Sequence, residues 1–304
     1  MDGRLDAIVI GAGPAGLAAA IYLARFRRQV LVLHDNDSRA AWIPRSHNHP
    51  GFPGGIVGAD LLARTRRQAE DFGARIEVAR VTGLAVEGEG FAVTTASRSL
   101  TARSVILATG VVDRLPDLPG VEAAVRRSLV RICPICDGFE VTGQAVAVIG
   151  DGALGAREAR FLQTYSDKVS LIHTGDPDAL PDDERAHLAW AGIRLIEAPI
   201  AEVVLDNDRL TALAFTDRGR LEFDAVYTAL GVDPCTDLAI EAGARRCDDG
   251  RLIVDDHQQT TVPGLYAAGD LVRGLNQIST AQGEAAIAAT ALHNRLREIE
   301  AVRT

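Results

Sequence analysis

The chain lacks both a surplus of basic residues and a long apolar run. Lys and Arg total 32 against 41 Asp and Glu, which gives a formal net charge of -9 at pH 7. An acidic balance provides no electrostatic attraction for nucleic acid or for an anionic membrane surface. The apolar runs are short and interrupted by glycine, so none reaches the length of a membrane span.

The N-terminus also lacks the features of a targeting signal. Met1-Asp2-Gly3-Arg4 does not begin the charged and then apolar layout of a signal peptide. We therefore expect a cytoplasmic protein. The 304 residues, 47% hydrophobic and 24% charged, predict a soluble globular chain of one large or two medium domains.

Cysteine is scarce, yet two of the four cysteines stand close together in Cys133-Pro134-Ile135-Cys136. Such a C-x-x-C pair can close a small-ring disulfide that cycles between oxidised and reduced forms. We expect Cys136 to open a helix, whose N-terminal dipole would stabilise its thiolate. Asp137 follows directly and is placed to exchange a proton with that thiolate.

Two other interpretations of the pair remain open, a zinc half-site and two unpaired thiols. Zinc needs four ligands, and Cys235 and Cys247 lack the tight spacing of a second half-site. In a reducing cytoplasm a C-x-x-C is more often catalytic or metal-binding than structural. The pattern therefore favours redox turnover and predicts no metal.

A dinucleotide fingerprint opens the chain. An apolar strand at 6–10 leads into a glycine turn and then a helix at 17–24, and the next strand, at 29–33, is followed by Asp35. The glycines allow a tight turn, a close approach to a pyrophosphate and packing of the helix on the strand. The turn residues predicted to bind the cofactor are Gly11, Gly13, Pro14, Ala15 and Gly16, with Asp35 on the ribose.

A long polar loop at 37–55 follows, and such loops in compact domains are usually functional or mobile. It contains His47 and His49, each a candidate base for a thiol substrate. Packing or hydrogen bonding is the alternative role for both histidines.

A second fingerprint of the same kind lies in the middle of the chain. A strand at 145–149 leads into Gly150, Gly152 and Gly155 and a helix to residue 162, and the strand at 169–172 ends at His173. This is an internal duplication of the strand–turn–helix unit. Near the C-terminus, a strand at 264–270 ends in Gly269 and Asp270, before a helix at 278–296 whose start can face a flavin.

Together these motifs resemble the low-molecular-weight thioredoxin reductases, which are flavoproteins with two dinucleotide-binding domains. The matching segments cover essentially the whole chain: Gly11 to Gly16, Asn48-His49-Pro50-Gly51-Phe52-Pro53, Ala108-Thr109-Gly110, Cys133 to Gly138, Ala267 to Asp270 and Gln277 to Ala286. The resemblance implies an α/β fold of two Rossmann-like domains, the second inserted in the first, and a homodimer.

The resemblance also implies domain bounds and residue roles. The FAD domain would comprise 1–114 plus 234–304, and the inserted NAD(P)H-type domain, with the C-x-x-C, would comprise 115–233. Cys136 would lie against the flavin, Cys133 would attack the partner disulfide, and Asp137 would donate and accept the proton. Further FAD-binding residues would be Arg39, Asn48, Ala108, Thr109, Gly110, Gln277 and Ile278.

The sequence departs from this family in the places that hold a nucleotide. NADPH-using members have His followed by two arginines where this chain has His173-Thr174-Gly175-Asp176. Without that guanidinium pair a 2′-phosphate has little to offset its desolvation. Asp151 also replaces a glycine of the second fingerprint. These departures argue against NADPH as the donor.

The first domain departs from the family as well. Asp35-Asn36-Asp37-Ser38-Arg39 replaces the usual acidic residue and Gly-Gly-Gln stretch, which looks more like the side branch that includes dithiol oxidases. In those oxidases a histidine usually follows the second cysteine, whereas this chain has Asp137, as reductases do.

The leading hypothesis is an FAD-dependent disulfide oxidoreductase that acts on a thioredoxin-like protein or a small dithiol or disulfide. The alternatives of the same fold are a dithiol oxidase, a ferredoxin-fed reductase and a diflavin disulfide oxidoreductase. The candidate ligands of the inserted domain are NAD(P)H and a second flavin. An alternative of another class is a flavin-bearing redox sensor without turnover.

Overall fold

The computed structural model describes residues 5–206 and 209–302, and it folds as two compact units. The first unit comprises Met1–Ala41, His49–Val112 and Asp233–Thr304, and the inserted unit comprises Trp42–Asn48 and Asp113–Val232. The predicted crossings at 114/115 and 233/234 lie close to these changes, whereas the grouping of Trp42–Asn48 with the inserted unit was not anticipated. The Met1–Arg4 stretch used in the targeting argument lies outside the described residues.

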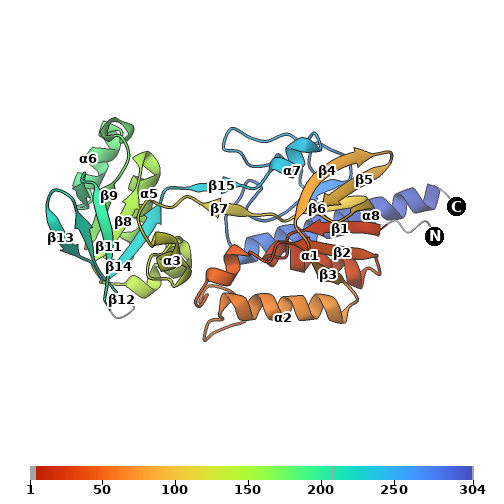
Figure 1. The fold of residues 1–304 in the computed structure, drawn as a ribbon, viewed down its shortest axis with the longest axis horizontal. Coiled ribbons are helices and arrows are strands. Elements are labelled where there is room, and N and C mark those ends of the chain that lie inside the picture. Colours follow the sequence, from red (N-terminus) through yellow and green to blue (C-terminus); the bar gives the residue numbers. More distant parts are fainter. Residues whose placement is uncertain (1–4, 207–208, 303–304) are drawn as a thin grey trace. The chain divides into compact units, whose positions relative to one another are not determined.

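A mixed sheet forms the centre of the first unit (Figure 1). Its order is β3-β2-β1-β6-β5-β4, with β16 also paired to β6. β1, β2, β3, β6 and β16 pair in parallel, and β4, β5 and β6 pair antiparallel. The strands are β1 (Leu5–Ile10), β2 (Val30–His34), β3 (Arg75–Val78), β4 (Val81–Glu87), β5 (Gly90–Thr95), β6 (Ser99–Leu107) and β16 (Leu265–Ala267).

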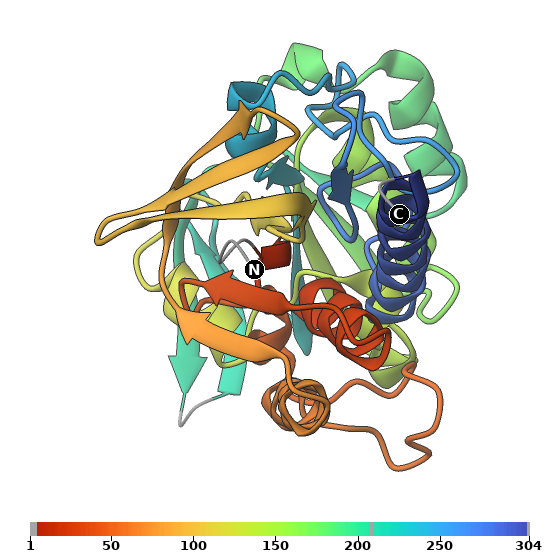
Figure 2. The same cartoon turned by 90° about the vertical axis from the view of Figure 1, so that its right-hand side faces the viewer.

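Side chains alternate across this sheet into two separate cores. Ala7 and Val9 of β1 face one core, with the alanine-rich faces of α1 (Pro14–Arg25) and α8 (Ile278–Val302). Ile8 and Ile10 face the other core. Small residues let the two helices approach closely, and Figure 2 shows them side by side along the sheet. α2 (Gly58–Asp71), α7 (Asp237–Glu241) and the short helix η1 (Arg39–Trp42) complete the unit.

The inserted unit is built on a smaller parallel sheet. Its order is β10-β9-β8-β14, and a separate antiparallel sheet has the order β11-β12-β13. Its strands are β8 (Val146–Gly150), β9 (Val169–His173), β10 (Arg194–Ile196), β11 (Ile200–Asp206), β12 (Arg209–Phe215), β13 (Gly219–Glu222) and β14 (Ala225–Ala229), and its helices are α3 (Val121–Arg126), α4 (Pro134–Asp137), η2 (Phe139–Val141), α5 (Gly152–Leu162), η3 (Pro177–Ala179) and α6 (Asp182–Trp190). The mixed sheet of the first unit and the parallel sheet of the inserted unit each contain a strand–turn–helix start, which confirms the predicted fold class.

The two chain crossings pair as a short two-stranded sheet of β7 (Val111–Asp113) and β15 (Val232–Pro234). Some predicted bounds were wrong. β16 ends at Ala267, whereas the sequence predicted a strand over 264–270, because the chain turns at Gly269, where φ is 91°. Within the described residues, no helix combines the length and the apolarity that crossing a membrane requires.

Candidate active site

The first glycine turn presents an open helix N-terminus. Gly11 has a φ of 109°, and a Cβ at Gly11 or Gly16 would overlap backbone atoms of Ala108 or Gly11 respectively. Gly13 is the N-cap of α1, and Leu17 N–H makes the first helical bond, to Gly13 O at 3.0 Å. Because glycine has no side chain, Gly13 leaves the N–H groups of Ala15 and Gly16 uncapped, as an anion site requires.

The other predicted residues of the first unit gather at the same edge of the sheet. β1, β2, β6 and β16 are parallel, so their carboxyl ends lie together, where ligands of such folds bind. Gly269 follows β16, and a Cβ there would lie 3.2 Å from the Ala15 Cβ at the start of α1. The edge also carries Asp35 after β2 and Ala108, Thr109 and Gly110 after β6.

Hydrogen bonds fix the backbone of this edge. Thr109 Oγ1 donates to Cys235 O at 2.6 Å, and Cys235 N–H donates to Gly110 O at 3.0 Å. At the β16 end, Gly269 N–H donates to the Glu284 carboxylate at 2.8 Å. Gln277 O accepts from Ala281 N–H at 3.0 Å, at the start of α8 that Ile278 opens.

Two charged groups of this edge face each other. Arg39 Nη1 lies 3.7 Å from Asp270 Oδ2, so the two predicted cofactor residues form an ion pair. Asp35 is exposed, and its carboxylate accepts from Asp37 N–H at 3.3 Å. The residue that ends β2 is His34, which is buried and lies 2.7 Å from the Arg66 guanidinium of α2. Sequence reasoning missed His34 and Arg66.

The polar loop divides between the two units. His47 is exposed, and Asn48 Nδ2 donates to Ile135 O of the C-x-x-C at 3.3 Å. His49 stacks on Phe52 with ring centroids 5.6 Å apart, and burial lowers the pKa of His49 below its ordinary value. A lowered pKa favours the neutral imidazole, which is the form that can accept a proton. The catalytic roles of both histidines, and the role of Asn48 toward FAD, stay predictions.

Cys133 and Cys136 form a disulfide, with their Cα atoms 5.3 Å apart. The predicted start of the helix was wrong. Pro134 occupies the first helical position and Cys133 is the N-cap, so Cys136 lies inside the single turn of α4. The described residues contain no group of three or more His, Cys, Asp or Glu able to hold a metal ion.

Asp137 is held by two side chains that the sequence analysis did not single out. Arg131 Nη1 lies 2.8 Å from Asp137 Oδ2, and the Tyr227 hydroxyl donates to Asp137 Oδ1 at 2.8 Å. Burial raises the pKa of Asp137, while Arg131 and Tyr227 act in the opposite direction. Burial also raises the pKa of Tyr227, so its hydroxyl stays protonated.

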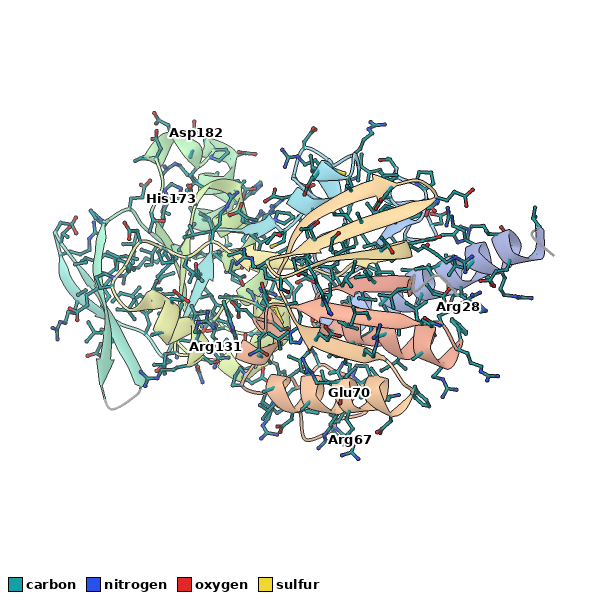
Figure 3. The ribbon with its side chains drawn as sticks, turned by 45° about the vertical axis from the view of Figure 1, so that its right-hand side comes forward. Arg28, Arg67, Glu70, Arg131, His173 and Asp182 are labelled. Atoms are coloured by element: carbon teal, nitrogen blue, oxygen red, sulfur yellow. A yellow bond between two sulfur atoms is a disulfide. The ribbon has the colours of Figure 1, made fainter. Side chains whose placement is uncertain are left out.

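The second glycine turn differs from the first because side chains occupy it. Gly152 N–H, the first amide of α5, donates to His173 Nε2 at 3.0 Å. The Asp151 carboxylate lies 3.3 Å from the same nitrogen, and a Cβ at Gly175 would overlap that carboxylate. Figure 3 labels His173 and Arg131, which lie in different parts of the inserted unit.

The first turn therefore fits the pyrophosphate of FAD, because no side chain caps its helix amides and Asp270, at the same edge of the sheet, is paired with Arg39. The second turn fits an anion poorly, because one amide is already used and a carboxylate lies beside it.

The chain is similar to known disulfide oxidoreductases over almost its whole length. Residues 5–285 match the model of the pyridine nucleotide-disulphide oxidoreductase family. A thioredoxin reductase of Treponema pallidum (strain Nichols) is 32% identical over 300 residues, which cover 96% of this chain and 97% of the relative.

Solved structures give the same result. The crystal structure of HlmI matches with a TM-score of 0.92 and 31% identity, over 100% of this chain and 96% of the other. Thioredoxin reductase from Streptococcus pyogenes MGAS5005 matches with a TM-score of 0.91 and 27% identity, over 98% and 100% of the two chains.

Proposed function

The chain belongs to the pyridine nucleotide-disulphide oxidoreductase family and is an FAD-dependent disulfide oxidoreductase of thioredoxin reductase type, and we propose that its electrons come from an external dithiol and not from NADPH. The observation that carries the proposal is the second glycine turn, where Gly152 N–H donates to His173 Nε2 and the Asp151 carboxylate lies 3.3 Å from the same nitrogen. The partner is a thioredoxin-like protein or a small dithiol, and the acceptor of the electrons is molecular oxygen.

The first unit supplies the cofactor site in this proposal. The uncapped amides of Ala15 and Gly16 would hold the FAD pyrophosphate, and Asp270, presented with Arg39, would accept a ribityl hydroxyl. Bound FAD supplies two-electron redox chemistry. The homodimer and the cytoplasmic location expected from the sequence belong to the same proposal.

Thiol–disulfide exchange takes place at the C-x-x-C. A thiolate of the dithiol attacks Cys133 Sγ, a new sulfur–sulfur bond forms, and the Cys133–Cys136 bond breaks with its electron pair on Cys136 Sγ. The second thiol of the partner then displaces Cys133, so the partner leaves as a disulfide and both cysteines are reduced. Asp137 accepts the proton that the attacking thiol loses and returns it to a leaving thiolate.

The residues at the second turn support the proposal that NADPH is a poor donor. Thr174 and Gly175 stand where NADPH-using members carry arginines, and the carboxylate of Asp151 lies against Gly175. A dianionic 2′-phosphate and a pyrophosphate would both meet negative charge there. The dithiol route needs no ligand at this turn.

The proposal is tested by mixing the FAD-loaded protein anaerobically with NADPH, NADH or dithiothreitol and following the absorbance of the flavin. We expect dithiothreitol to bleach the flavin and both pyridine nucleotides to leave it oxidised, with oxygen uptake once air is admitted. Rapid bleaching by NADPH would contradict the proposed donor. No bleaching by any of the three would favour a redox sensor. In the same experiment, dithiothreitol should leave the flavin of Cys136→Ser oxidised. Cys235→Ser is the matched control for this variant.

A further inference from the structure

The carboxylate of Asp137 accepts from two side chains that approach it from different segments of the inserted unit. Arg131 precedes the disulfide, and Tyr227 lies on β14, 90 residues after Asp137. Each contacts a different carboxylate oxygen at 2.8 Å. Both also reach the Asp137 carbonyl, Tyr227 at 3.2 Å and Arg131 at 3.4 Å. The carboxylate therefore has one defined orientation.

The backbone explains why these side chains converge. Arg131 pairs with Tyr227 in a parallel bridge, with Arg131 N–H donating to Val226 O and Thr228 N–H donating to Arg131 O, both at 2.8 Å. The segment that enters the C-x-x-C is thus attached to the edge of β14. Residues opposite each other in such a bridge project on the same side, so both side chains reach Asp137.

Burial has the largest effect on Asp137 and raises its pKa, and the two side chains bonded to its carboxylate oppose that rise. Arg131 contributes a positive charge and Tyr227 a hydroxyl donor, whereas Glu140 is a like charge that disfavours ionisation. The Asp137 and Arg131 side chains are each 25% exposed, so the ion pair is largely shielded from water. Hydrogen bonds to a charged group in such surroundings are stronger than those to a neutral one.

We infer that Arg131 and Tyr227 are positioning residues that keep the Asp137 carboxylate ionised and oriented as the proton acceptor of exchange at Cys133–Cys136. This inference rests on the proposed function. In the step concerned, the proton lost by the attacking thiol passes to Asp137 as the sulfur–sulfur bond breaks, and then to the Cys136 thiolate. Neither Arg131 nor Tyr227 gains or loses a proton.

The test is the pH profile of exchange between the FAD-loaded, oxidised protein and dithiothreitol. Samples are quenched with N-ethylmaleimide, and alkylated Cys133 and Cys136 are counted by mass spectrometry between pH 5 and 9. A base is active only when ionised, so a higher pKa moves the acid limb of the profile to higher pH. Loss of one hydrogen bond to a carboxylate moves it by about one pH unit.

We expect Tyr227→Phe to move the acid limb up by that amount and Arg131→Gln to move it further. In an Asp137→Asn background neither change should move it. Thr228→Val is the matched control on the same strand, because the Thr228 hydroxyl is buried with no hydrogen-bond partner among the described residues. It should leave the profile unchanged.

Two results would overturn the inference. One is an exchange rate that falls equally at every pH in Tyr227→Phe, which would indicate a purely structural role. The other is the same shift in the Asp137→Asn background, which would show that the effect does not pass through Asp137. If the wild-type disulfide itself failed to react with dithiothreitol, the proposed function would fall first. That result is distinguishable because it appears without any variant.

Discussion

The two glycine turns share a motif and differ in what occupies their helix N-termini. At α1, Gly13 is the N-cap and the following amides are uncapped. At α5, Asp151 is the N-cap, and the first amide donates to His173. In both turns the last glycine lets the helix pack on the strand, since a Cβ would contact backbone.

The comparison separates two roles of one fingerprint. The glycines at Gly11, Gly16, Gly150 and Gly155 serve the packing of strand and helix, which both units need. Anion binding depends on the residues between them, where Ala12 of the first turn corresponds to Asp151 of the second. The inserted unit thus keeps the strand–turn–helix fold, while at its turn the first helix amide donates to His173 and the Asp151 carboxylate lies beside it.

The largest effect is expected from making the first turn resemble the second. Ala12→Asp places a carboxylate beside the pyrophosphate position, and like charges about 4 Å apart repel by about 4 kcal/mol at an effective dielectric of 20, roughly a thousandfold in affinity. We expect the Ala12→Asp protein to be purified without bound FAD, which is measured as the flavin released per chain. Ala12→Asn adds a side chain of the same size without the charge, so this variant should keep most of its bound FAD. Equal FAD content in Ala12→Asp and Ala12→Asn would show that the charge is not what weakens FAD binding.

The next largest effect concerns packing. Gly16→Ala should lower the free energy of unfolding by about 1–3 kcal/mol, because the added methyl overlaps Gly11 O in the backbone. At Gly155 the methyl would lie 2.9 Å from Gly150 backbone atoms, so Gly155→Ala should cost less. Thermal unfolding measures both. A larger loss of unfolding free energy in Gly155→Ala than in Gly16→Ala would contradict the structural equivalence of the two turns.

A smaller gain is expected from opening the second turn. Because a Cβ at Gly175 would overlap Asp151, arginine at that position requires the removal of the carboxylate. The triple variant Asp151→Gly, Thr174→Arg, Gly175→Arg should bind NADPH roughly tenfold more tightly than wild type, a gain of about 1.4 kcal/mol. Fluorescence titration measures the affinity. The two arginine changes alone, with Asp151 retained, should give no such gain.

The smallest effect lies away from either turn, where Arg28 and Arg103 pair with Glu300 and lower its pKa to about 2. A lowered carboxylate pKa stabilises the fold above the unfolded-state value, and this stabilisation disappears as the pH falls toward 2. Glu300→Gln should therefore cost under about 1 kcal/mol at neutral pH, since the pair is partly exposed. Its FAD content should be unchanged. Denaturant unfolding of the wild type and of Glu300→Gln between pH 2 and 7 checks whether their free energies of unfolding become equal as the pH falls.

Local patterns predicted the elements that local chemistry determines. The first strand, turn and helix and the strand ending at His173 follow from hydrophobic periodicity and glycine placement, and the structure confirms them. The C-x-x-C likewise predicted a disulfide, which is present. Each of these depends on residues close together in the chain.

What the sequence could not predict depends on distant contacts. The sequence analysis did not single out Tyr227, because its hydroxyl meets Asp137 only through the bridge between Arg131 and β14. The occupancy of the second turn by His173 was hidden for the same reason, although Asp151 had been noted. The grouping of Trp42–Asn48 with the inserted unit arises from contacts such as Arg126 over the Trp42 ring.

The most direct test of the account is an anaerobic titration of the FAD-loaded protein with dithiothreitol, in wild type and in Cys136→Ser. The account predicts that the flavin absorbance of the wild type falls in proportion to the dithiol added, while that of Cys136→Ser, with the same FAD content, stays constant. Equal bleaching of the two proteins would contradict the claim that electrons pass through Cys133 and Cys136.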